Sequence, residues 1–321
     1  MSASYPSEPS ERDRWILARR GARNRLDASS ACAGLHEEEP DGSGRTVPVS
    51  TIFLTNRECP WRCLMCDLWR DTLEESVPAG AIPSQIANAL TGLPPARWIK
   101  LYNAGSFFDP RAIPPEDHDA IAETVRGFER VIVESHPALV AEPVLRFRDA
   151  LAGSLEVAMG LETVHPEVLP KLNKRMTLEQ FRSAARFLAG EGIGIRAFVL
   201  VGLPFVGAEE FADWACRSAE FAFESGASVV SLIPTRTGNG AMDALMRAGE
   251  FSPPGLAALE AAHASGLHLR RGRVLADLWD FSRLARCGSC ARDREARLRR
   301  MNLSQTVLPP IPCADCGGSA S

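Results

Sequence analysis

The sequence lacks any long hydrophobic segment and contains very little lysine. Its longest apolar run, residues 197–208, is far shorter than the roughly 20 residues that a membrane-spanning helix needs. Residues 1–21 are polar and charged, without the apolar core of a signal peptide. Only three of the 36 basic residues are lysines, a bias that indicates a GC-rich genome rather than a particular substrate. We therefore expect a cytoplasmic protein with no membrane association.

A strong net charge is also absent. The formal net charge of −4 gives no overall attraction to nucleic acid, and no RNA-binding domain is evident. With 45% hydrophobic and 24% charged residues, the 321 residues are sufficient for one large globular domain and a small appendage. We expect a partly flexible N-terminal extension at residues 1–48, a central domain at 49–284 and a C-terminal metal-binding tail at 285–321.

Three cysteines stand close together in the stretch TNRECPWRCLMCDLWRD, with no fourth cysteine nearby. Cys59, Cys63 and Cys66 have the spacing C-x3-C-x2-C. A structural zinc site uses four ligands and a disulfide uses two cysteines, so a set of three indicates a metal centre with one open position. Clustered thiols in the cytoplasm stay reduced and bind metals. Of the other cysteines, Cys216 lies on an apolar helical face and is expected in the core, whereas Cys32 receives no role.

Short apolar or β-branched runs alternate with amphipathic segments from residue 49 onward. The runs predict six strands, at residues 49–55, 98–103, 131–135, 155–162, 195–202 and 229–235. Helical patterns lie between them, and Gly192 and Gly226 are typical stop signals. Such units predict an α/β fold in which a parallel sheet curls into a partial barrel with its helices outside. Because ligands bind at the C-terminal ends of such strands, the cysteine loop is expected at the functional rim.

With this loop, the sequence resembles the radical S-adenosylmethionine (radical SAM) superfamily, whose signature is C-x3-C-x-Φ-C after the first strand of a partial (β/α)6 barrel. The resemblance implies that Cys59, Cys63 and Cys66 hold a [4Fe-4S] cluster, in which three cysteines leave one iron free. In the family, S-adenosylmethionine chelates that iron, and the reduced cluster cleaves it to methionine and a 5′-deoxyadenosyl radical. The alternative interpretation is a half-formed zinc site or a chance grouping of cysteines.

The resemblance extends to segments that contact S-adenosylmethionine in the family. Met65 occupies the Φ position, which is often aromatic and lies near the adenine. After the second strand, the family has a Gly-Gly-Glu type turn that receives the methionine amino group. This sequence has YNAGSFFDP there, so Asn103, Gly105 and Ser106 take its place and the glutamate is missing.

Later strands supply further expected contacts. GLETVHPEVLPKLNKRMT resembles the corresponding segment of the superfamily and implies that Glu162 binds the ribose hydroxyls, since a carboxylate can accept from both. Arg196 and the turn VGLPFVGAEE on the fifth strand correspond loosely to the family's backbone contact with the adenine. His136, Arg236 and Asn239 follow the third and sixth strands, where the rim would bring them near a substrate, although each is equally compatible with a structural role.

A second metal signal lies near the C-terminus. The stretches CGSC and CADC form two C-x2-C pairs separated by 22 residues: Cys287, Cys290, Cys313 and Cys316. Two such pairs favour a closed tetrahedral zinc site, and an auxiliary [4Fe-4S] cluster is the alternative. A predicted helix between the pairs carries five arginines, at positions 292, 294, 297, 299 and 300. These arginines are typical either of a solvated face or of a surface that follows a phosphate backbone.

Within the superfamily, the sequence is most similar to the branch of the archaeosine synthase radical SAM subunit and the Elongator catalytic subunit. The shared stretches include IFLTNRECPWRCLMCDLW, GSFFDPRAIP and SLIPTRTGNGAMD. This resemblance implies C–N bond cleavage on a lysine-modified 7-deazaguanine base in tRNA, with a ferredoxin or flavodoxin as low-potential electron donor. The alternatives are a radical SAM enzyme acting on a small molecule or natural-product intermediate, and a non-catalytic zinc-dependent interaction module.

Overall fold

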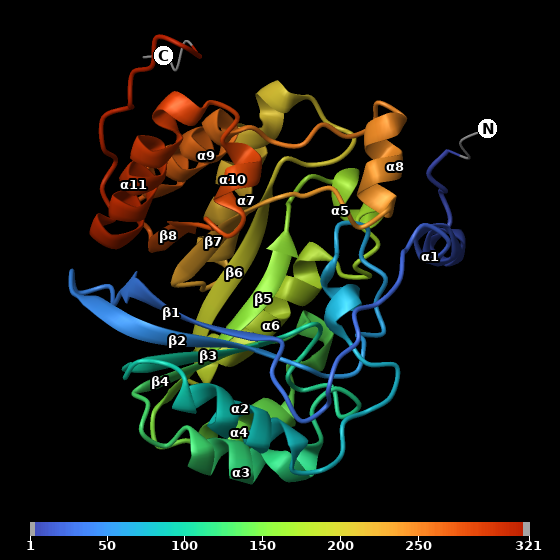
Figure 1. The fold of residues 1–321 in the computed structure, drawn as a ribbon, viewed down its shortest axis with the longest axis vertical. Coiled ribbons are helices and arrows are strands. Elements are labelled where there is room, and N and C mark those ends of the chain that lie inside the picture. The colour runs from blue at the N-terminus through green and yellow to red at the C-terminus, as the bar shows by residue number, and fades with distance from the viewer. Residues whose placement is uncertain (1–3, 317–321) are drawn as a thin grey trace.

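One eight-stranded sheet, curled into a half-barrel, organises the protein (Figure 1). The structure is a computed structural model that describes residues 4–316, so the outer ends of the predicted N-terminal extension and C-terminal tail lie outside the described residues. The strands follow one another in sequence order: β1 (Ala33–Pro40), β2 (Thr46–Leu54), β3 (Trp98–Asn103), β4 (Arg130–Glu134), β5 (Ser154–Glu162), β6 (Gly194–Val201), β7 (Val229–Pro234) and β8 (Arg273–Ala276). The predicted α/β partial barrel is confirmed.

The sheet contains two strands beyond the six predicted ones. From β2 to β8 all neighbouring strands are parallel, whereas β1 pairs antiparallel to β2. The sequence of β1, AGLHEEEP, has three consecutive glutamates and lacks the apolar alternation of a strand, and β8 has only four residues. Part of the segment assigned to the N-terminal extension is therefore an edge of the barrel sheet.

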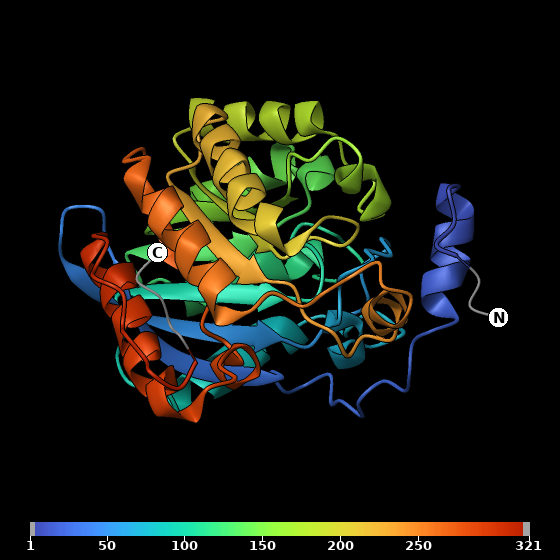
Figure 2. The same cartoon turned by 90° about the horizontal axis from the view of Figure 1, so that it is seen from above.

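Helices cover the outer face of the sheet (Figure 2). The α-helices are α1 (Pro9–Leu17), α2 (Ala81–Thr91), α3 (His118–Thr124), α4 (Glu142–Ala150), α5 (Val168–Lys171), α6 (Leu178–Gly190), α7 (Phe211–Glu224), α8 (Ala241–Arg247), α9 (Leu256–His268), α10 (Phe281–Leu284) and α11 (Gly288–Ser304). Short 3-10 helices are η1 (Leu68–Asp71), η2 (Pro115–Asp117), η3 (Pro137–Leu139) and η4 (Ala208–Glu210). Among residues 4–316, no helix is long and apolar enough to cross a membrane.

Side chains alternate between the two faces of the curled sheet, as the period of two in a strand requires. On β4, Val131 and Val133 pack outward into the main core under the helices, whereas Ile132 packs inward with Trp98 and Ala158. The inward face forms the lumen of the half-barrel. The side chains of β4 that lie on the same face as Ile132 therefore point into the lumen, where ligands of such barrels bind.

The lower lumen is filled by a network of buried ion pairs. The guanidinium of Arg196 donates to both carboxylate oxygens of Glu39, at 2.8 and 2.6 Å, and to Glu156 at 2.8 Å. Lys100 pairs with Glu37 and Glu39. Although burial acts to raise it, the pKa of Glu39 is held below its usual range by Arg196 and Lys100. Carboxylates on β1 and β5 thus occupy the donors of the Arg196 side chain, whereas the expected backbone contact of this strand with the adenine stays a prediction.

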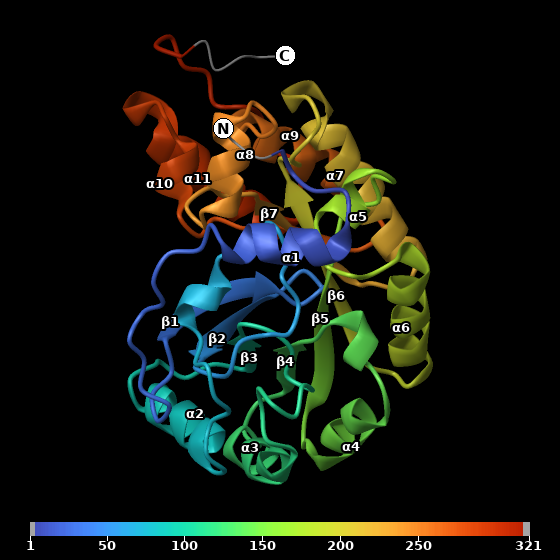
Figure 3. The same cartoon turned by 90° about the vertical axis from the view of Figure 1, so that its right-hand side faces the viewer.

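The N-terminal helix α1 is packed against the barrel and is not a loose tail (Figure 3). Arg12 donates to the Pro170 carbonyl at 2.8 Å, and Tyr5 donates to the Lys171 carbonyl at 2.6 Å. Trp15 and Ile16 are buried against apolar side chains of α8. These contacts fix α1 beside the segment that follows β5.

Replacement of Arg196 tests the lumen network. Arg196→Ala leaves Glu39 and Glu156 buried without their main partner, so we expect a loss of about 3–5 kcal/mol in the free energy of unfolding. The matched control is Arg97→Ala, since the Arg97–Glu129 pair is exposed and is expected to contribute less than about 1 kcal/mol. Urea denaturation of both variants measures the difference. Equal losses would show that the buried network contributes no more than a surface pair.

Candidate active site

The cysteine loop follows the C-terminal end of β2 and is held by backbone contacts from distant segments. Asn239, just before α8, donates from Nδ2 to the carbonyls of Leu64 at 2.8 Å and Cys66 at 3.2 Å. Asn173, just after α5, donates to the Arg62 carbonyl at 2.8 Å. The loop itself is irregular, so these two amides fix its path. The sequence suggests Asn239 as a substrate contact, but the structure gives it this positioning task.

The three thiols of the loop converge. Each lies close enough to affect the ionisation of another, and burial raises the pKa of Cys59, Cys63 and Cys66 to about 12. Neutral thiols of this kind become ligands when a metal displaces their protons. Gly105 allows the close approach of the turn after β3, because a Cβ there would lie 3.2 Å from the Cβ of Cys59. The group fits a cluster held by three thiolates.

A buried amide without hydrogen bonds lies beside the cysteines. Asn103, the last residue of β3, is 3% exposed, and neither its Oδ1 nor its Nδ2 has a partner within the described part of the chain. Leaving such groups unpaired costs about 1–3 kcal/mol each, so the position suits a polar ligand. The neighbouring Ser106 differs, because its hydroxyl already accepts from the backbone N–H of His136 at 2.7 Å.

Glu162 forms an ion pair in the upper lumen. Its Oε1 accepts from the ammonium of Lys174 at 2.7 Å, and Glu162 itself has a left-handed backbone with φ of 66°. The pair lies over Gly160, where any Cβ would collide with both charged groups. Lys174 also acts to lower the pKa of the Cys59 and Cys63 thiols. The carboxylate predicted to bind a ribose thus stands next to the cysteines, with one oxygen engaged by Lys174.

His136 supports the loop through its ring. The imidazole stacks on Trp61 of the cysteine loop, with ring centroids 3.8 Å apart and planes at 9°. Its Nε2 lies 3.1 Å from the Lys174 carbonyl, and its Nδ1 accepts from the Ala138 N–H at 3.1 Å. Burial and the nearby Lys174 lower the pKa of His136 to about 4, so the ring is neutral. His136 positions Trp61 and does not offer a free nitrogen to a substrate.

The other predicted residues lie around the same rim. Met65 packs between the apolar clusters of α8 and of the segment near α5. Arg236, after β7, pairs with Asp277 at 3.0 Å. Sequence patterns did not identify Trp61 and Lys174 as site residues, although Trp61 lies in the cysteine loop and Lys174 in the stretch GLETVHPEVLPKLNKRMT.

The four C-terminal cysteines meet as a second group. Their sulfur atoms all lie within 4.8 Å of one another, with Cys287 and Cys313 3.8 Å apart and Cys290 and Cys316 3.7 Å apart. Backbone N–H groups at the start of α11 lower the pKa of the Cys287 thiol to about 7, which favours the thiolate that binds metals. The group is a candidate metal site.

The arginines between these cysteines have different roles. Arg294 and Arg297 pair with Glu260 of α9, and Arg297 also donates to the carbonyls of Leu308 and Pro309. They hold α11 and the chain that returns to the cysteines. Arg292 and Arg300 are exposed.

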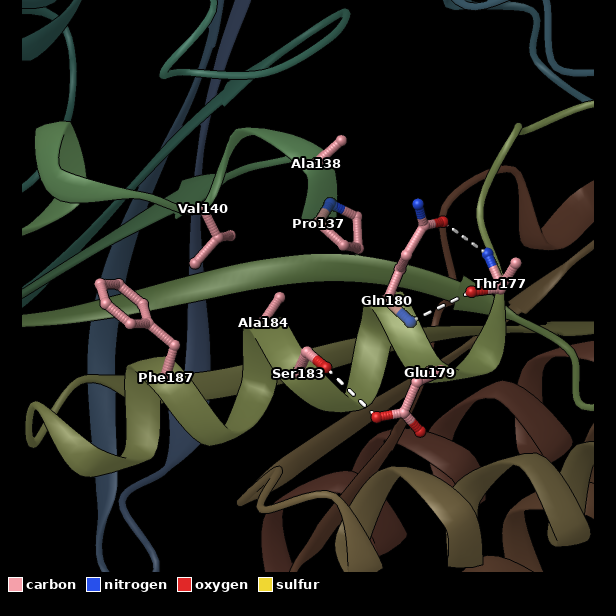
Figure 4. A pocket seen from close by; sticks show the side chains of 9 residues that line it. All are labelled: Pro137, Ala138, Val140, Thr177, Glu179, Gln180, Ser183, Ala184 and Phe187. Atoms are coloured by element: carbon pink, nitrogen blue, oxygen red, sulfur yellow. Dashed lines mark hydrogen bonds between the residues drawn. The ribbon is translucent and has the colours of Figure 1, made fainter.

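A groove between η3 and α6 lies outside the barrel (Figure 4). Its polar side chains serve the helix start, since Thr177 and Gln180 form a capping box. Its lining contains no buried ion pair like Glu162–Lys174 and no buried unpaired amide like Asn103. We therefore place the candidate site in the lumen and not in this groove.

Comparison of the fold identifies its class. Elp3 from the archaeon Methanocaldococcus infernus matches 68% of this chain and 59% of its own chain, with a TM-score of 0.50 and 14% sequence identity. The chain has the radical SAM fold. In this fold the cysteine loop after β2 occupies the position that the C-x3-C-x2-C spacing predicts.

Two archaeal relatives share part of the sequence. An uncharacterized protein of Methanocaldococcus jannaschii is 28% identical over 220 residues, which cover 64% of this chain and 60% of the relative. Archaeosine synthase subunit beta of Methanosarcina acetivorans is 24% identical over 227 residues, covering 67% of this chain and 65% of the relative. The chain thus spans slightly less than two thirds of each relative's length. No family model matches the sequence.

Exchange of one amide for a carboxylate tests how the loop is held. Asn239→Asp keeps an oxygen for the N–H of Met242 but removes the donor to Leu64 and Cys66. Each lost bond is worth about 1 kcal/mol, so we expect amide hydrogen exchange in residues 57–67 to rise about tenfold or more. Asn24→Asp, which alters an exposed hydrogen bond to Asp71, is the matched control. Unchanged exchange in Asn239→Asp would contradict the positioning role.

Proposed function

We propose that this protein is a radical SAM enzyme with its reaction site in the lumen of the half-barrel. The observation that carries the proposal is the meeting of three loop thiols, an unpaired buried amide and a charged lumen within the radical SAM fold. When bound, the cluster and S-adenosylmethionine would supply methionine and a 5′-deoxyadenosyl radical, at the cost of one electron from a low-potential donor. We infer that a ferredoxin or flavodoxin provides this electron.

The chain's own residues would hold and orient these groups. Cys59, Cys63 and Cys66 would be the cluster ligands. Asn103 would offer its amide to the amino acid part of S-adenosylmethionine, since that amide has no partner among the described residues. Glu162 would accept from the ribose hydroxyls with the oxygen that Lys174 leaves available.

We further infer that the reaction is C–N bond cleavage on a lysine-modified 7-deazaguanine base in tRNA. The support is the sequence similarity to archaeosine synthase subunit beta over 227 residues, 67% of this chain. The exposed Arg292 and Arg300 on α11 add positive charge that suits a phosphate backbone.

For the C-terminal cysteines we propose zinc. Four thiolates bound tetrahedrally at about 2.3 Å from a zinc ion would lie about 3.8 Å apart. Two of the observed sulfur separations, 3.8 Å for Cys287–Cys313 and 3.7 Å for Cys290–Cys316, agree with that value, and all four sulfurs lie within 4.8 Å of one another. An auxiliary four-iron cluster places each thiolate on a different iron and requires wider spacing. The zinc would join α11 to the returning chain.

The initiating chemistry can be tested on protein purified and reconstituted without oxygen. With a reductant and S-adenosylmethionine, we expect 5′-deoxyadenosine from the native protein and none from the Cys59→Ala, Cys63→Ala, Cys66→Ala triple variant, because the cluster loses its ligands. Mass spectrometry measures the product. The control is Cys32→Ala, which removes a cysteine outside both groups.

The same assay separates the substrate hypotheses. Addition of tRNA that carries the lysine-modified base is expected to increase 5′-deoxyadenosine formation and release the C–N cleavage product. Formation without any response to this tRNA would favour a small-molecule substrate. Absence of 5′-deoxyadenosine from native protein containing about four irons would contradict radical SAM activity and favour a non-catalytic module.

Metal analysis tests the C-terminal site. We expect about one zinc per chain, and its loss in Cys290→Ser together with a lower melting temperature, because three ligands do not close a tetrahedral site. Cys216→Ser provides the control, since Cys216 lies on α7 away from both groups. About eight irons per native chain, without zinc, would instead assign a second cluster.

A further inference from the structure

Glu134 is a lumen carboxylate that the proposed roles leave unused. It is the last residue of β4, and its side chain lies on the same face of the strand as those of Arg130 and Ile132. Arg130 pairs with Glu156, and Ile132 packs in the inner apolar cluster. Its side chain therefore points into the lumen at the C-terminal end of the sheet. The nearby Lys174 and Glu162 both influence its pKa, so Glu134 lies close to the ion pair beside the cysteines.

Unlike the carboxylates of the lower lumen, Glu134 has no matching cation of its own. Within residues 4–316, its carboxylate makes no hydrogen bond or ion pair, and the ammonium of Lys174 binds Glu162 instead. Burial raises the pKa of Glu134 to about 8; the nearby Lys174 lowers this pKa in part, and the weaker repulsion from Glu162 adds to the rise. A partly buried carboxyl in this state gains most from a ligand that brings a positive charge.

Aromatic rings line the lumen around this carboxyl. Phe53 and Tyr102 have centroids 6.2 Å apart, Tyr102 and Phe198 are 6.0 Å apart, and Phe53 and Trp279 are 5.5 Å apart. These rings come from three strands and the chain after β8, and Trp279 is 48% exposed, so the wall reaches solvent. Strands β3 and β4 pair in parallel with Leu101 opposite Val133, so the next residues, Tyr102 and Glu134, lie side by side on the lumen face.

We propose that Glu134 and this aromatic wall form a subsite that binds the ammonium group of an amine substrate. The inference deepens the proposed function and rests on it for the nature of the reaction. A carboxylate and the negative faces of aromatic rings both attract a cation, and their attraction is strongest where water is excluded. An alkyl chain behind the ammonium would contact the rings. The subsite would repel phosphates, so a nucleic acid would insert an amine-bearing side chain while its backbone stayed outside.

The test measures binding of a simple amine to reconstituted protein with S-adenosylmethionine and no reductant. By isothermal titration, n-hexylamine, which is cationic at pH 7.5, is expected to bind about tenfold or more tightly than 1-hexanol, which has the same length and no charge. Glu134→Gln should remove this preference, whereas Glu134→Asp should retain part of it. Phe198→Leu should weaken binding of the amine by severalfold through loss of one ring. The control is Glu179→Gln, an exposed carboxylate at the outer groove.

Two outcomes would overturn the subsite. One is equal binding, or no binding, of the amine and the alcohol by the native protein. The other is an unchanged preference in a Glu134→Gln variant whose circular dichroism and melting temperature match the native protein. Because the titration needs no reductant, it can fail while 5′-deoxyadenosine still forms, and it can succeed when no 5′-deoxyadenosine forms. The substrate subsite and the proposed reaction are thereby judged separately.

Discussion

The rest of the site depends on the hydrogen bonds that two asparagine side chains donate to the backbone of the cysteine loop. The loop between β2 and η1 is irregular, so its carbonyl groups need donors from elsewhere. Asn173 and Asn239 supply them from segments more than a hundred residues away in the sequence. The position of the three thiols thus depends on contacts between distant segments of the barrel.

Contacts between distant segments also bring the supporting residues together. The segment after β5 contributes Lys174 to the lumen and Asn173 to the loop, and α1 holds that segment from outside through Arg12. His136 connects it to the end of β4, because its ring contacts both the Lys174 carbonyl and Trp61. The N-terminal helix is therefore part of the framework of the site, although it contributes no group to the lumen.

Charge is distributed unequally along the lumen. In its lower part, Arg196 and Lys100 pair with glutamates of β1 and β5. In its upper part, the amide of Asn103 is buried without a hydrogen bond within the described residues, and the ammonium of Lys174 pairs with Glu162 and not with Glu134. Burying unpaired polar groups costs free energy, so their position at one end of the barrel marks where ligands contribute the missing interactions.

The sequence by itself determined the six central strands, because their alternation and turn residues are local signals, and it placed the cysteine loop after the first of them. It also determined the two cysteine groups, since their spacing is short enough to be read along the chain. It did not reveal β1, in which Glu39 is buried and pairs with Arg196 and Lys100 across the lumen.

The tertiary structure alone decided the partners of each polar side chain. Sequence patterns suggest ligand contacts for His136, Asn239 and Arg196, and in the structure their side chains contact a tryptophan, loop carbonyls and a buried ion network, respectively. Glu134 looked like an ordinary end of a strand, and the lumen made it an unpaired carboxyl among aromatic rings. Such roles depend on contacts between distant segments, whose free energies no local pattern records.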